Sequence, residues 1–196
     1  MPKDHGLETL LQNEKDDPAP PEIITPAKYQ EALDSCDEEL LPVVVLMGFG
    51  GIRREEVLKM GWADVWELQD CVEVNAREAK TSERRVLERS SVINAWLAPY
   101  RQHKGRIWKH SKGVLHHRLD DIREKTGLKG KHNVLRHSFG SYRYAVTDSA
   151  DKTSKEMGNS PTTLKKSYYR LATPTQGAEW FGLMPPKSSA KVIKAA

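Results

Sequence analysis

An almost continuous apolar stretch at residues 40–49 limits most strongly what this chain can fold into. It reads LLPVVVLMGF and contains no charged side chain. A helix of this composition is apolar on every face, so other elements must pack around it. The stretch is also far shorter than the ~20 apolar residues that cross a bilayer. We therefore expect 40–49 to be a buried core helix and not a membrane segment.

After this stretch the hydrophobic pattern changes its period. Alternation at 71–76 and, around Val86, at 84–89 predicts two strands of a β-hairpin, with polar residues 77–83 as its loop. Helical spacing and capping residues, such as Thr25 before Pro26, predict helices at 26–33, 54–60, 92–97, 114–125, 132–146, 153–157, 161–170 and 176–181. The expected fold class is α+β: a mostly helical domain with a small antiparallel β-sheet.

Composition divides the chain of 196 residues into three parts. Residues 1–23 are acidic and contain the Pro-rich run DDPAPP, which predicts a tail or linker remnant with no signal peptide. Residues 24–184 are expected to form one folded domain, and 185–196 a basic, disordered tail. Two cysteines, Cys36 and Cys71, are too few for a disulfide framework and indicate a cytoplasmic location.

Charge is distributed unevenly along the chain. Residues 1–100 hold 11 basic and 20 acidic side chains, whereas 101–196 hold 20 basic and 7 acidic ones. A basic half in which Arg and Lys alternate with Tyr and Trp is typical of a protein with a polyanionic partner such as nucleic acid. The alternative is a basic surface that is merely solvated.

Four short motifs resemble those of the tyrosine recombinases, the phage integrase family. They are GIRREEVL at 51–58 with Trp62 and Asp64 after it, AKT at 79–81, LRHSF at 135–139, and MGNSP at 157–161 followed by Tyr168. They occur in the family's order, and the resemblance covers about residues 24–183. It implies that 24–184 has the fold of the family's catalytic domain.

This resemblance implies an enzyme that breaks and rejoins double-stranded DNA with neither a metal nor another cofactor. A tyrosine hydroxyl attacks the scissile phosphate, forms a 3′-phosphotyrosine and releases a 5′-hydroxyl that can later reverse the step. The transition state needs fixed cations at the phosphate oxygens and a proton for the leaving oxygen. The implied function is site-specific recombination, the integration or excision of a mobile element.

The motifs assign a role to each chemically active side chain. Arg53 and Arg136 are expected to bind phosphate oxygens, because a guanidinium stays charged and offers a planar fork of donors. Lys80, in the hairpin loop, is the expected proton donor to the leaving oxygen. Tyr168 is the expected nucleophile and the adjacent Tyr169 its rival, since the two point roughly 100° apart on a helix.

Two positions depart from the family's pattern. Asn133 stands where the family has His, three residues before Arg136, and Asn159 stands where His or Trp is usual. Asn can donate a hydrogen bond to phosphate but cannot take a proton from tyrosine. The structural alternatives are a helix N-cap for Asn133 and a turn residue for Asn159. His132 is a possible substitute, because i−3 and i−4 neighbours share a helical face with Arg136.

Two further residues have expected supporting roles. Glu56 is expected to orient groups near Arg53, and His137 to support Arg136 or to accept a backbone contact. No His, Cys or acidic residues have the spacing of metal ligands, so no metal is expected.

The resemblance also implies partners beyond DNA itself. Several copies of the chain are expected to assemble on DNA, as a tetramer in synapsis and a monomer alone, with no membrane partner. Residues 176–184, which include Trp180 and Phe181, are expected either to pack on a neighbouring protomer or to pack intramolecularly.

Two other functions stay open from the sequence. A protein of the same fold that has lost DNA cutting is a DNA-binding regulator or a remnant of a mobile element, and Asn133 and Asn159 favour that reading. An enzyme similar to the type IB topoisomerases relaxes supercoils with the same chemistry and without strand exchange. A covalent DNA adduct and a preference for particular sites distinguish these possibilities.

Overall fold

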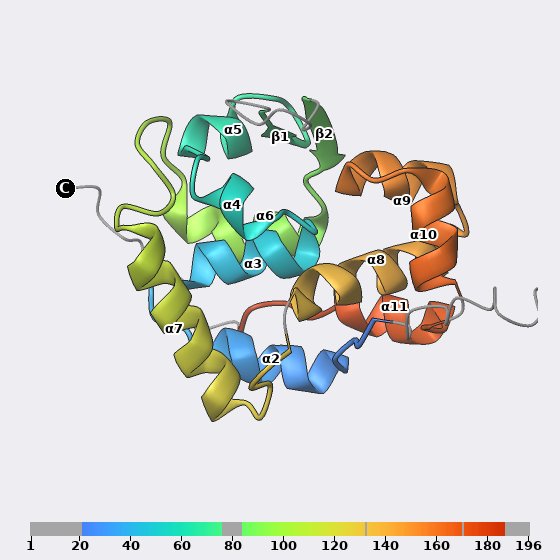
Figure 1. The fold of residues 1–196 in the computed structure, drawn as a ribbon. Coiled ribbons are helices and arrows are strands. Elements are labelled where there is room, and N and C mark those ends of the chain that lie inside the picture. Colours follow the sequence, from blue (N-terminus) through green and yellow to red (C-terminus); the bar gives the residue numbers. More distant parts are fainter. Residues whose placement is uncertain (1–20, 76–83, 132, 170, 187–196) are drawn as a thin grey trace, which may run out of the picture.

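The computed structural model describes residues 21–75, 84–131, 133–169 and 171–186 (Figure 1). Its elements are α2 (Pro26–Asp34), α3 (Leu41–Phe49), α4 (Arg54–Val57), α5 (Trp62–Trp66), β1 (Cys71–Val74), β2 (Arg85–Glu88), α6 (Ser91–Leu97), the 3₁₀ helix η1 (Ala98–Tyr100), α7 (Lys112–Lys125), α8 (Val134–Thr147), α9 (Ala150–Met157), α10 (Pro161–Tyr168) and α11 (Pro174–Phe181). The predicted fold class, mostly helical with a small antiparallel sheet, is confirmed. No helix of the described residues has the length and apolar character needed to cross a membrane.

Helix α3 is the central core helix that the apolar stretch predicts. Every residue from Pro42 to Phe49 is buried. Helices α3 and α8 cross the middle of the molecule and pack on each other (Figure 1). The β-hairpin, α4 and α5 lie on one side of this pair, and α2 and α11 lie on the other (Figure 1). Because α3 has no polar face, it is covered on both sides.

Helix α11 packs on its own chain. Its Trp180 is fully buried, and the indole stacks on Tyr29, with ring centroids 4.3 Å apart, and on Tyr142, at 4.7 Å. The indole Nε1 also donates a hydrogen bond to the Gly48 carbonyl at 3.2 Å. Of the two expectations for residues 176–184, the structure shows intramolecular packing for α11 through Trp180.

The two strands of the predicted hairpin are present, but Val86 lies on the exposed face of the second strand and not on its buried face. Strands β1 and β2 pair antiparallel, with Cys71 opposite Glu88 and Val74 opposite Arg85. In β2 the buried residues are Arg85 and Leu87, whereas Val86 is 48% exposed. Alternation around Val86 located the strand correctly, but it does not reveal that a charged residue faces inward.

Helix ends agree best with the prediction where a side chain caps the helix. Thr25 Oγ1 accepts a hydrogen bond from the Lys28 backbone N–H at the start of α2, and Ser160 Oγ does the same for Thr163 at the start of α10. The predicted helix at 54–60 is shorter in the structure and ends at Val57, and α5 was not predicted.

Candidate active site

Three arginine side chains converge on the C-terminal end of α9. Their hydrogen bonds run from Arg85 Nε to the Glu156 carbonyl (2.9 Å), from Arg136 Nη2 to the Met157 carbonyl (2.6 Å) and from Arg53 Nη2 to the Gly158 carbonyl (3.0 Å). The last carbonyls of a helix have no intrahelical partners and carry the negative end of the helix dipole. The end of α9 therefore holds three cations that come from distant parts of the sequence.

Two of these cations share a single neutral acceptor. Arg53 Nη2 and Arg136 Nη2 each donate a hydrogen bond to Asn159 Oδ1, both at 3.1 Å. Asn159 follows directly on Gly158, the left-handed residue that ends α9. The carbonyl oxygen of an uncharged amide only partly compensates two guanidinium charges. The point where they meet therefore favours an anion.

Arg136 is fixed by its surroundings. Its side chain is buried and donates a further hydrogen bond to the Gly51 carbonyl. Burial, together with the charges of Arg53 and Arg85, lowers the pKa of Arg136 to about 10, so the group stays charged at neutral pH. Gly51 has φ +60°, and a Cβ there would lie 2.2 Å from the Phe139 ring, so only glycine fits this turn.

Glu56 lies between Arg53 and Arg85. Its carboxylate accepts hydrogen bonds from the Arg53 backbone N–H (2.8 Å) and Nη1 (3.1 Å), and from Arg85 Nη1 (2.8 Å) and Nη2 (2.7 Å). Burial opposes ionisation of this carboxyl, but the hydrogen bonds and charges of Arg85 and then Arg53 lower the pKa of Glu56 to about 2. Glu56 thus contacts Arg53, the residue near which a supporting role was expected for it, whereas Arg85 was missed in the sequence.

Because of this network, the free energy of unfolding depends on pH in the acid range. The pKa of Glu56 falls from its ordinary 4.5 to about 2 on folding, so its contribution is complete above pH 4.5 and is lost as the pH falls toward 2. A shift of this size corresponds to about 3 kcal/mol at neutral pH. We expect Glu56→Gln to lower the free energy of unfolding at pH 7 and to flatten its decline between pH 4.5 and 2, measured by urea unfolding.

The neighbouring Glu55 offers a matched control for this measurement. It is also ion-paired, with Arg54 and Lys112, but half of its side chain is exposed. Solvent screening makes such a pair weak. An equal loss of stability in Glu55→Gln and Glu56→Gln would contradict the role given to the buried carboxylate.

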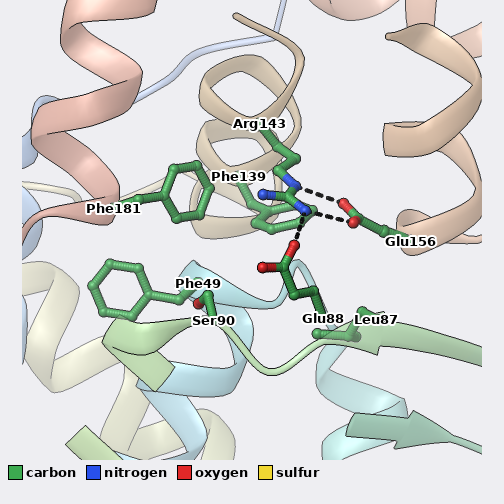
Figure 2. A pocket seen from close by; sticks show the side chains of 8 residues that line it. All are labelled: Phe49, Leu87, Glu88, Ser90, Phe139, Arg143, Glu156 and Phe181. Carbon is green, nitrogen blue, oxygen red and sulfur yellow. Dashed lines mark hydrogen bonds and ion pairs between the residues drawn. The ribbon is translucent and has the colours of Figure 1, made fainter. Parts of the chain in front are cut away.

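A second buried ion pair holds α9 in place from its other side. Figure 2 shows Arg143 of α8 pointing at the carboxylates of Glu156, on α9, and Glu88, at the end of β2. Its Nε and Nη2 donate to Glu156 at 2.8 and 2.7 Å, and Nη2 also donates to Glu88 at 2.9 Å. Since Glu156 also accepts from Arg85 through its backbone carbonyl, the end of α9 that carries Asn159 is tied to both α8 and the hairpin.

Tyr168 lies inside the molecule beside this cluster. Its ring packs with Phe139, Met157 and Leu164, and only 5% of the residue is exposed. A Cβ at Gly140 would lie 3.2 Å from the Tyr168 ring, so the glycine allows the close approach of α8 and α10. Burial raises the pKa of Tyr168, while the charges of Arg136 and then Arg53 act in the opposite direction.

The two tyrosines of the motif differ sharply in their surroundings. The Tyr168 hydroxyl is hydrogen-bonded to His137 Nδ1 at 3.0 Å. Tyr169 is 56% exposed, and its ring lies against Tyr144 with centroids 6.3 Å apart. The charges of Arg136 and then Arg53 both favour the ionised form of Tyr168. His137 thus contacts the candidate nucleophile, a partner that the sequence did not indicate.

Asn133 is not brought to the arginine cluster. Helix α8 begins at Val134, and Asn133 precedes it with φ +54°, in the left-handed region that Asn tolerates. The predicted helix start at 132 was wrong, so the argument that i−3 shares a face with Arg136 does not hold for Asn133. Its side chain is exposed, makes no capping hydrogen bond, and lines a cavity beside Leu119 and Val134.

Two expected site residues lie outside the described part of the chain. Lys80 belongs to the undescribed segment 76–83, and His132 is the single undescribed position before Asn133. Within the described residues, no group of three or more His, Cys, Asp or Glu side chains is arranged to hold a metal ion.

Comparison with known structures identifies the fold. The chain is similar to XerA recombinase, with a TM-score of 0.64 and 16% identity over 86% of this chain and 65% of that one. It is also similar to the integrase from mycobacterium phage Brujita, with a TM-score of 0.60 and 15% identity over 85% and 59% of the two chains. A third similar structure is XerH site-specific recombinase bound to palindromic difH substrate in a post-cleavage complex, with a TM-score of 0.56 and 18% identity over 75% and 49%.

These similarities show a tyrosine recombinase- and integrase-like fold. The chain spans about half to two thirds of the length of the recombinase and integrase structures that it matches. No family model matches the chain, and no curated protein matches its sequence.

Proposed function

We propose that this chain is the catalytic part of a tyrosine recombinase, which breaks and rejoins double-stranded DNA through a covalent 3′-phosphotyrosine. The observation that carries the proposal is the convergence of Arg53 and Arg136 on one acceptor, beside the buried Tyr168 hydroxyl that both charges influence. The fold supports it, since the similar structures are recombinases and an integrase.

The arginine pair fits the charge that develops at a phosphate under attack. Non-bridging phosphate oxygens accept the same hydrogen bonds that Asn159 Oδ1 accepts, and they carry more negative charge. Fixed donors that are already in place stabilise the transition state without reorganisation. Glu56 and the end of α9 hold Arg53 and Arg136 in that arrangement. The amide nitrogen of Asn159 supplies a further, neutral donor for the phosphate.

In the proposed reaction Tyr168 oxygen forms a bond to phosphorus while the bond from phosphorus to the 5′-oxygen breaks. The tyrosine proton goes to a protein base, and the 5′-oxygen receives a proton from Lys80, which we propose as the general acid. The reverse step rejoins the strand when a 5′-hydroxyl attacks the phosphotyrosine. No water and no metal takes part, so the bond energy is kept in the intermediate.

The wider function that we propose is site-specific recombination, the integration or excision of a mobile element, in the cytoplasm. Double-stranded DNA is the proposed partner, and several copies of the chain are proposed to assemble on it, as a tetramer in synapsis. The alternative is a DNA-binding regulator of the same fold. Asn133 favours this alternative, because it stands where the family has His. It precedes α8, and its side chain makes no capping hydrogen bond there.

Covalent trapping tests this proposal. The protein is incubated with duplexes taken from the ends of its element and nicked near the scissile phosphate, so that the short 5′-hydroxyl fragment diffuses away. A protein–DNA adduct that survives a denaturing gel is the expected result. Binding with no adduct would favour the regulator, and relaxation of any supercoiled plasmid without site preference would favour an enzyme similar to the topoisomerases.

A further inference from the structure

Attack by tyrosine requires a group that accepts the hydroxyl proton. The position at which the sequence resembles a recombinase histidine holds Asn133, and an amide cannot take this proton. In the structure Asn133 also lies outside α8 and makes no side-chain hydrogen bond to the cluster. The acceptor must therefore be another group that reaches Tyr168.

His137 is placed to be that group. Its Nδ1 lies 3.0 Å from the Tyr168 hydroxyl oxygen, and the two ring centroids are 5.9 Å apart at an interplanar angle of 40°. This distance is within the range for direct proton transfer between heavy atoms. His137 follows Arg136 on α8, so one short backbone segment places both a phosphate-binding cation and a base.

The charged surroundings of His137 favour its neutral form. Burial and then the charge of Arg136, on the same helix, lower the pKa of His137 below its ordinary 6.5. Facing it from α10 is Tyr168, which Arg53 also influences from the start of α4. Within the described residues, no hydrogen bond joins the His137 ring to a carboxylate. A neutral imidazole with its proton on Nε2 has a free lone pair on Nδ1 for the tyrosine proton.

We infer that His137 is the general base of the proposed reaction and takes the proton of the Tyr168 hydroxyl as the oxygen attacks phosphorus. This inference rests on the proposed function. The O–H bond of Tyr168 breaks and an N–H bond forms at Nδ1, which leaves an imidazolium. On rejoining, the departing tyrosine oxygen takes the same proton back, so His137 is neutral again. His137 is thereby a catalytic residue that contacts the reacting atom.

Three variants test this inference under single-turnover conditions with saturating nicked duplex. His137→Gln keeps a hydrogen-bond acceptor near the hydroxyl but cannot take the proton, and we expect adduct formation about 100-fold slower with the DNA affinity unchanged. His137→Ala is expected to be equally slow and to recover as neutral imidazole is added. His117→Gln is the matched control, because His117 is 80% exposed on α7 and should behave as wild type.

A substrate with sulfur at the 5′-bridging position separates base from acid. A thiolate leaves without a proton, so this substrate removes the need for a general acid. The His137→Gln defect is expected to persist on it, whereas a Lys80→Ala defect is expected to disappear. Recovery of His137→Gln on the sulfur substrate would assign His137 to the leaving group and overturn the inference.

The pH dependence of the wild-type reaction also tests the inference, and this measurement does not depend on the folding of any variant. Adduct formation is expected to slow as the pH falls through the pKa of His137, which burial and Arg136 place below 6.5, because the protonated ring can no longer accept a proton. A rate that does not decline in this acid range overturns the inference. A His137→Gln rate within twofold of wild type, or a His137→Ala defect that imidazole does not reduce, also overturns it. If the wild type itself forms no adduct on any duplex, the proposed function fails, and the inference fails with it.

Discussion

Tyr168→Phe is expected to abolish the covalent DNA adduct, whereas Tyr169→Phe is expected to leave it intact. Without the hydroxyl no oxygen is present to attack phosphorus, so the loss amounts to several orders of magnitude in rate. Tyr169 lies on the surface, with its ring against Tyr144. The measurement is the amount of protein–DNA species on a denaturing gel with nicked duplexes, for wild type and both variants.

The Tyr168→Phe variant should remain folded and bind DNA. Its ring still fills the space between Phe139 and Leu164, and only the hydrogen bond to His137 is lost, a cost of about 1 kcal/mol. DNA affinity, measured by fluorescence anisotropy, should match wild type because the arginine cluster is untouched. An adduct that persists in Tyr168→Phe and vanishes in Tyr169→Phe would make Tyr169 the nucleophile.

Local signals in the sequence predicted most of the elements. The apolar stretch at 40–49 predicted a core helix, and Thr25 before Pro26 located the start of α2. These features depend on residues within a few positions of one another, so the sequence displays them directly.

The contacts that build the candidate site are long-range and were predicted only in part. Arg53 and Arg136 are 83 positions apart in sequence, yet the motif pattern indicated both of them. Arg85 was missed, because an arginine in a strand normally faces solvent. Its burial depends on two partners from elsewhere, the Glu56 carboxylate and the Glu156 carbonyl.

A single backbone angle accounts for another failure of the sequence reasoning. Helical spacing placed Asn133 on the face of Arg136, but its left-handed conformation breaks the spacing one residue before α8 begins. The contact of His137 could not be predicted for a different reason. The helical pattern of α8 does not indicate which neighbour the His137 ring contacts. The packing of α10 against α8 at Gly140 brings Tyr168 to it.

Asn159→Asp is expected to stabilise the fold while it nearly eliminates DNA cleavage. A carboxylate in place of the amide accepts the hydrogen bonds of Arg53 and Arg136 as an anion, and such bonds are stronger than those to a neutral oxygen. We expect a gain of about 1 kcal/mol in the free energy of unfolding, which raises the Tm by roughly 2–4 °C. Urea and thermal unfolding measure this part of the prediction.

The introduced carboxylate pairs with Arg53 and Arg136, the two cations that a phosphate needs for binding. It repels the substrate anion and removes the amide donor, so we expect adduct formation at least about 100-fold slower than in wild type. Asn133→Asp is the matched control: its exposed side chain makes no capping hydrogen bond, so both stability and cleavage should stay near wild type. A cluster built for stability alone would gain from Asn159→Asp and lose nothing. Unchanged cleavage in that variant would therefore contradict a phosphate site between Arg53 and Arg136, and opposite changes in stability and rate would support it.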